Sequence, residues 1–98
     1  EDMTVFAVEY VYDSARTDDI AALRPQHREF IARLHEEGSV LASGPWEDNA
    51  TPGALVIVSA EDADAVQRLL DEDPFHQAHL ITQRTLRPWK PILGPFAQ

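Results

Sequence analysis

The stretch Leu23-Arg24-Pro25-Gln26-His27-Arg28-Glu29-Phe30-Ile31-Ala32-Arg33-Leu34 decides how the rest of the chain is arranged. Its apolar residues recur at the three-to-four spacing that places side chains on one face of an α-helix. His27 lies on that same face, so its imidazole is expected to point into the packed interior and to need a polar partner there. Pro25 suits the first turn of a helix, where its missing N–H leaves no hydrogen bond unmade. We therefore predict a helix that starts near Arg24 and ends at Gly38, after a short separate turn over Ile20–Leu23.

Four segments around this helix have strand propensity. Thr4–Tyr12 is rich in β-branched and aromatic residues, and Leu55–Val58 is an apolar run without helical spacing. Val40–Ser43, closed by Gly44-Pro45, and Leu80–Leu86 are the other two. Because both faces of Thr4–Tyr12 are largely apolar, we expect the sheet to be covered on both sides. One of these faces carries Phe6, Val8, Tyr10 and Tyr12.

A second helix is predicted from Ser59 or Glu61 to Leu70. After it, Asp73 is placed to cap a new helical turn that has Pro74 in its first position. The resulting order β-α-β-β-α-β is the split βαβ arrangement of a ferredoxin-like α+β domain. Helices cover only one face of such a sheet, so its apolar opposite face predicts a homodimer, with a second copy of the chain as partner.

Length, charge and composition indicate how many domains the chain forms and which kinds of partner they argue against. The 98 residues form one domain, 1–98, with its core over about 4–89 and an irregular proline-rich tail over 88–98. A net charge of −9 argues against nucleic acid and anionic membrane as partners. The chain has no cysteine and no membrane-length apolar run, so a cytoplasmic protein without disulfides or thiolate metal ligands is expected.

His27 and Asp73 are the candidate catalytic pair. A histidine on an apolar face is more often a packing residue, and Asp73 alone is explained by its capping role. Asp73, however, continues the apolar spacing of the second helix, and the two helices of this fold lie side by side. A carboxylate beside an imidazole fixes the tautomer of the ring and prepares it for proton transfer. The pair is therefore a candidate acid–base dyad.

Ordered motifs along the chain resemble the YCII-related (YciI-like) domain family. They are Arg24-Pro25-x-His27, Gly38, Ser43-Gly44-Pro45, Gly53 before an apolar strand, Asp73-Pro74-Phe75 and Arg87-Pro88-Trp89. The resemblance covers Val5 to Trp89. It implies a ferredoxin-like domain that dimerises into an α+β barrel, and an active-site pair that corresponds to His27 and Asp73. It also implies similarity to enzymes that eliminate from, isomerise or oxidise small hydroxylated rings without a metal.

Four further residues are candidates for substrate binding. Arg24 offers positive charge to an enolate or carboxylate, although a salt bridge explains it equally well. Ser43 and Gly44 follow a strand, where a loop N–H can meet a ligand, but a turn into Pro45 accounts for the same glycine. Tyr10 either lines a pocket or packs in the core.

His76 and His79 have a spacing that permits a metal site, yet no further ligands converge on them, and a solvated pair is the simpler interpretation. No metal or cofactor is therefore expected.

Two function classes follow from these residues. The first is a small cofactor-independent enzyme in which His27, oriented by Asp73, moves a proton on a small organic substrate in an elimination or isomerisation. The alternative is a non-catalytic module that binds a small molecule or serves as an accessory subunit.

Overall fold

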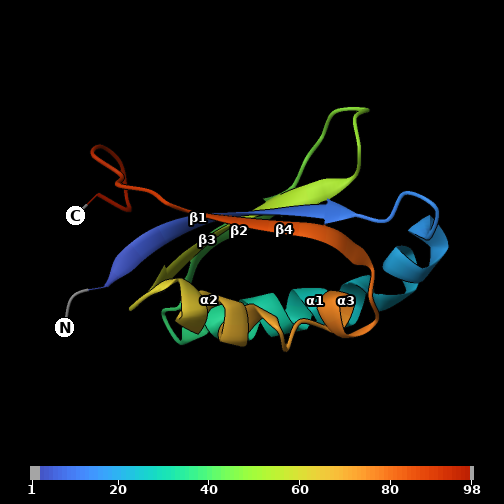
Figure 1. The fold of residues 1–98 in the computed structure, drawn as a ribbon, viewed down its shortest axis with the longest axis horizontal. Coiled ribbons are helices and arrows are strands. Elements are labelled where there is room, and N and C mark those ends of the chain that lie inside the picture. The colour runs from blue at the N-terminus through green and yellow to red at the C-terminus, as the bar shows by residue number, and fades with distance from the viewer. Residues whose placement is uncertain (1–2, 98) are drawn as a thin grey trace.

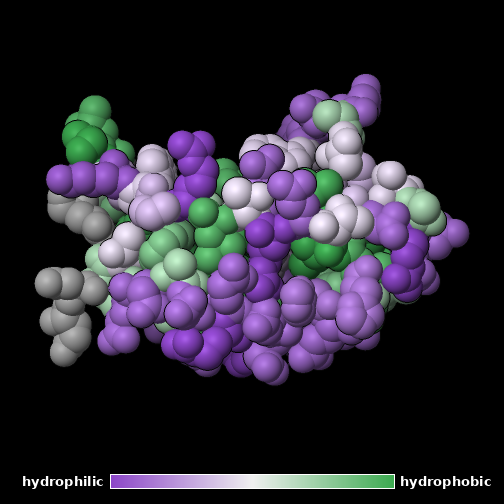
Figure 2. All heavy atoms as spheres, in the orientation of Figure 1, coloured by the Kyte–Doolittle hydropathy of each residue, from purple (hydrophilic) through white to green (hydrophobic). Residues whose placement is uncertain are grey.

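The computed structural model describes residues 3–97, which form a four-stranded antiparallel sheet with helices on one face (Figure 1). In chain order the elements are β1 (Thr4–Tyr12), α1 (Thr17–Glu36), β2 (Val40–Pro45), β3 (Gly53–Ala60), α2 (Ala63–Leu70), α3 (Pro74–Gln77) and β4 (Ile81–Pro88). The strand order in the sheet is β2-β3-β1-β4. The predicted ferredoxin-like α+β fold is confirmed. Figure 2 shows hydrophilic side chains gathered over the helical layer.

Strand β1 is central because it pairs with both β3 and β4. The face of β1 that packs against the helices carries Phe6, Val8, Tyr10 and Tyr12, which are all buried in the core with residues of α1, α2 and α3. Tyr10 lies opposite Ala54 of β3 and Arg84 of β4. Gly53 opens β3 at a point where an added Cβ would collide with the backbone carbonyl of Tyr10. A side chain at Gly53 would therefore push the two strands apart where the site is built.

Helix α1 begins earlier than the sequence predicted. It runs without interruption for 20 residues, and Pro25 lies inside it rather than in its first turn. The apolar stripe reaches back to Ile20, which is 2% exposed, so tertiary packing stabilises the turns that precede the proline. Pro25 has no N–H to donate to the carbonyl of Ala21, and both residues are exposed. Arg24 and His27 consequently lie in the middle of a helix about 30 Å long.

Gly38 marks the end of α1 as predicted, whereas α2 begins later than predicted. Gly38 follows α1 with φ of 92°, and its N–H donates to the carbonyl of His35, as expected for a left-handed residue after a helix. Helix α2 begins at Ala63, later than predicted, because β3 continues to Ala60 and Asp62 caps the helix through the N–H of Ala65. Strand β2 extends through Pro45, which an edge strand tolerates because it forms hydrogen bonds on one side only.

The face of the sheet away from the helices remains partly open in a single chain. The loop between β2 and β3 and the C-terminal tail both rise from this side (Figure 1). The tail is irregular, as predicted, but Ile92 and Leu93 are 69% and 91% exposed and lie on no apolar surface of this chain. Trp46 and Trp89 are also exposed. Among residues 3–97, no helix combines the length and apolarity needed to cross a bilayer.

Candidate active site

Asp73 and His27 contact each other in the buried layer between the helices and the sheet. The Nδ1 atom of His27 lies 2.9 Å from Oδ1 and 3.0 Å from Oδ2 of Asp73. Asp73 is completely buried and His27 is 8% exposed. The carboxylate also caps α3, because its Oδ1 accepts the N–H of Phe75 at 2.9 Å. The side chain of Asp73 therefore both caps α3 and contacts the imidazole of His27. The sequence had offered these as two separate interpretations of Asp73.

Tyr10 supplies a third donor to the same carboxylate. Tyr10 lies on β1, and its hydroxyl donates to Oδ2 of Asp73 at a distance of 3.0 Å. Burial raises the pKa of Tyr10 far above its usual range, and the charge of Asp73 and this hydrogen bond raise it further. The phenol therefore stays protonated and remains a donor. Tyr10 is not among the residues that line the cavity described below, so it lies behind the pair instead of at the substrate position predicted for it.

These contacts determine which nitrogen of His27 is free. A carboxylate only accepts hydrogen bonds, so Nδ1 carries the proton that it shares with Asp73. The Nε2 atom has no hydrogen-bond partner among residues 3–97, and no buried side-chain N or O atom among them is unpartnered. Nε2 therefore keeps some solvent access. When the ring is neutral and Nδ1 carries the proton, the nitrogen lone pair is on Nε2.

The ring plane of His27 is held by aromatic contacts. Phe75 stacks on the imidazole with ring centroids 4.2 Å apart and an interplanar angle of 6°. Tyr12 meets the edge of Phe75 with centroids 5.3 Å apart. Since Phe75 follows the capping Asp73 by two residues, α3 fixes both the hydrogen-bond partner and the stacking partner of the imidazole.

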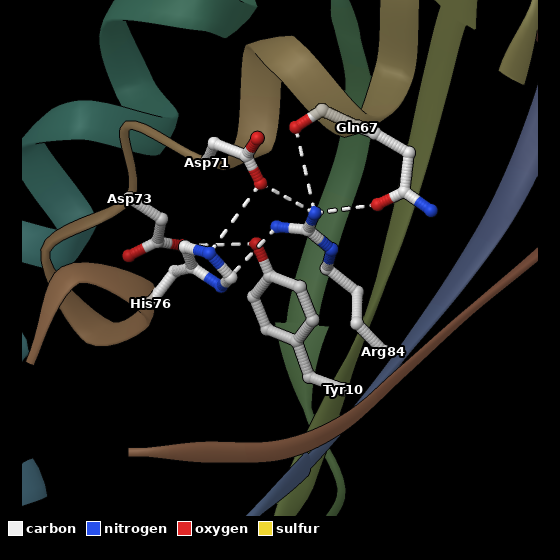
Figure 3. A network of polar contacts seen from close by, with 6 residues as sticks. All are labelled: Tyr10, Gln67, Asp71, Asp73, His76 and Arg84. Carbon is white, nitrogen blue, oxygen red and sulfur yellow. Dashed lines mark hydrogen bonds and ion pairs between the residues drawn. The ribbon is translucent and has the colours of Figure 1, made fainter. Parts of the chain in front are cut away.

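A second polar cluster, centred on Arg84, lies next to Asp73 and Tyr10 (Figure 3). The guanidinium of Arg84 on β4 contacts Asp71 at 2.6 Å, Gln67 through its amide oxygen, and Nδ1 of His76 at 3.5 Å. Its side chain is only 10% exposed. Arg84 thus joins the C-terminal end of α2 to the sheet next to Tyr10. The turn from α2 to Asp73 is anchored by this contact.

A cavity of about 400 Å³ lies beside His27, between α1 and the edge strand β2. It brings together four of the predicted site residues: Arg24, His27, Ser43 and Gly44. Its lining also includes residues that sequence reasoning passed over, namely Arg28, His35 and the apolar side chains of both walls. Arg28 and His35 could have been found from their spacing, because they follow Arg24 by four and eleven residues on the same helix.

His76 and His79 do not converge on one site. His76 lies beside Asp71 and Arg84, while His79 follows α3 with φ of 59°. Within residues 3–97, no group of three or more His, Cys, Asp or Glu side chains is arranged to hold a metal ion.

Known proteins share both the sequence pattern and the fold. The model of the YCII-related domain matches residues 4–90. Protein YciI of Escherichia coli O6:H1 and Protein YciI of Shigella flexneri are each 29% identical over 93 residues, which cover 84% of this chain and 95% of the relative.

Solved structures extend the likeness to the fold. The 5-chloro-2-hydroxyhydroquinone dehydrochlorinase of Burkholderia phenoliruptrix, in complex with 2,5-dihydroxybenzoquinone, superimposes with a TM-score of 0.76 at 20% identity, covering 96% of this chain and 99% of that one. PA3566 from Pseudomonas aeruginosa gives 0.57 at 13% identity, covering 95% and 97%. At these identities the likeness establishes the fold alone.

Proposed function

This chain belongs to the YCII-related domain family, and we propose that it is a small enzyme in which His27 and Asp73 perform general acid–base chemistry on a small organic substrate. The observation that carries the proposal is the paired contact of His27 Nδ1 with both oxygens of Asp73 at 2.9 and 3.0 Å, beside an open cavity. A purely structural histidine would not need a free ring nitrogen at a cavity.

The proposed step is a proton transfer through Nε2 of His27. The lone pair on Nε2 accepts a proton from an acidic O–H or C–H of the substrate, and the carboxylate of Asp73 stabilises the imidazolium that forms. The imidazolium then returns the proton to another substrate atom in an isomerisation, or to the medium after a leaving group has departed in an elimination. A residue in this role contributes about 10²- to 10⁴-fold to the rate.

A dehydrochlorinase with the same fold suggests the first substrate to test. In 5-chloro-2-hydroxyhydroquinone, loss of one proton and one chloride ion leaves a hydroxyquinone, so the reaction needs no oxidant. Chloride release by the wild-type chain should fall about 10²-fold or more in His27→Ala and in Asp73→Asn. Asn can donate to Nδ1, which moves the proton to Nε2 and removes the base.

Two controls make this experiment decisive. His79→Asn removes an exposed imidazole that does not line the cavity and does not contact Asp73, and it should retain turnover. Far-ultraviolet circular dichroism should show that each variant is folded. Full turnover in a folded His27→Ala variant would contradict the proposal. Tight binding of the substrate without release of product would favour a non-catalytic binding module.

We also propose that the chain acts as a homodimer in the cytoplasm. Trp46, Trp89, Ile92 and Leu93 are exposed on segments that rise from the open face of the sheet, where a second copy would cover them (Figure 1). A monomer mass by light scattering at micromolar concentration would contradict the dimer. Fluorescence imaging of a tagged chain tests the location.

A further inference from the structure

One face of α1 forms a cationic wall along the cavity. The lining residues of this helix follow the three-to-four spacing of a single face. They are Arg24, His27, Arg28, Ile31, Ala32 and His35. Two of these six side chains, those of Arg24 and Arg28, are guanidinium cations, and Ile31 and Ala32 add apolar surface. The wall therefore combines groups that bind anions with apolar surface.

No acidic side chain of residues 3–97 lines the cavity, and the carboxylate of Asp73, which contacts His27, is fully buried. None of the lining residues, all of which belong to the described range 3–97, is Asp or Glu, although the whole chain has 17 acidic residues against 8 Lys and Arg. Arg24 and Arg28 form no ion pair with any carboxylate of residues 3–97. Glu29 follows Arg28 directly, but adjacent residues of a helix point to different sides.

The rest of the cavity suits an apolar body. Ile31 and Ala32 of α1 face Leu41, Ala42 and Pro45 of the edge strand. The charge of Arg24 reaches Tyr12, another lining residue, where it partly offsets the rise that burial and Asp73 cause in the pKa of the phenol. Nδ1 of His35 donates to the carbonyl of Val40 at 2.7 Å, which holds that ring against the strand.

We propose that the cavity selects organic anions, with a carboxylate or another anionic group bound by Arg24 and Arg28 and an apolar body lying between α1 and β2. This substrate class rests on the proposed function of His27. An anionic group held by the arginines would position the rest of the molecule against the free Nε2 of His27. An arginine fork binds such a group in two places and therefore fixes its orientation.

The test compares aromatic carboxylates with their primary amides, beginning with benzoate and benzamide, by titration calorimetry. Carboxylates should bind, and the matched amides should bind at least about tenfold more weakly, as expected for the loss of a charge-assisted hydrogen bond. Arg24→Gln and Arg28→Gln should each weaken carboxylate binding by a similar factor. His27→Gln should bind the carboxylates nearly as well as the wild type does.

Arg33→Gln is the matched control. It removes the same charge from the same helix, but Arg33 lies away from the cavity, with its guanidinium 5.6 Å from the ring centroid of Phe30. Carboxylate binding should be unchanged in this variant. Equal binding of amides and carboxylates, no carboxylate binding, or an equal loss in Arg33→Gln would each overturn the proposal. Turnover retained in His27→Gln would instead refute the acid–base function and leave the preference for anions standing.

Discussion

The Oδ2 atom of Asp73 accepts the hydroxyl of Tyr10 at 3.0 Å, and the same carboxylate holds Nδ1 of His27. Sixty-three positions separate Tyr10 from Asp73 and forty-six separate His27 from Asp73. A strand, the middle of a long helix and the cap of a short helix therefore converge on one buried acid. Each donor that the carboxylate accepts lowers the cost of burying its charge.

Tyr10→Phe should reduce the free energy of unfolding by about 1.5–3 kcal/mol, because it removes a hydrogen bond to a buried charged group. Tyr12→Phe is its matched control, since the hydroxyl of Tyr12 has no hydrogen-bond partner within residues 3–97 and its loss should cost far less. Urea denaturation of the two variants measures the difference. Equal losses would show that the hydroxyl of Tyr10 does not stabilise Asp73.

Stability should fall in alkali. Burial, followed by the charge of Asp73, raises the pKa of Tyr12 from 10.0 to about 12, with Arg24 opposing the change. Above pH 10.0 the unfolded chain loses this proton while the folded chain keeps it, so the free energy of unfolding decreases until the pH reaches about 12. Tyr10, whose pKa is also raised, contributes in the same direction.

The alkaline loss is checked by urea denaturation at about pH 9 and about pH 11, on either side of the ordinary tyrosine pKa. Tyr12→Phe should show a smaller decrease between these two values than the wild type. A stability that is flat over this interval in the wild type would contradict the buried, neutral state of both phenols.

Arg84→Met should destabilise the protein by about 1 kcal/mol and speed hydrogen exchange at the amide of Phe75. The guanidinium contacts Asp71 and Gln67, and its loss frees the turn that leads to Asp73. Arg84→Lys should rescue only part of this effect, because an ammonium lacks the planar fork. Arg87→Met, on an exposed position of the same strand, should leave both measurements nearly unchanged.

Pro25→Ala should stabilise the protein by about 1 kcal/mol or more, because an interior proline is about 3 kcal/mol less favourable than alanine and the gain is partly offset in the unfolded chain. The substitution restores the hydrogen bond that the proline removes from the middle of α1. Thermal denaturation measures the change. A neutral or destabilising result would be expected of a first-turn proline and would contradict the continuous helix.

Much of the fold was already present in local sequence. The alternation along β1 placed Phe6, Val8, Tyr10 and Tyr12 on one face, because successive strand residues point to opposite sides. Since both faces are largely apolar, only the structure shows that the helices cover this one. Asp73 followed by Pro74 identified the start of α3, since cap and first-turn preferences depend on neighbouring residues only. The order of the elements along the chain predicted the ferredoxin-like fold, and the structure gives its sheet the strand order β2-β3-β1-β4.

The sequence by itself also selected His27 and Asp73 as a pair, from their spacing on two apolar stripes and from the family resemblance. It could not determine how α1 continues through Pro25, because burial of Ile20 against the sheet outweighs the local preference of a proline. Nor could it separate Tyr10, which supports the acid, from Arg28, which lines the cavity. Those assignments depend on which side chains meet across the core, and only the tertiary structure brings such distant residues together.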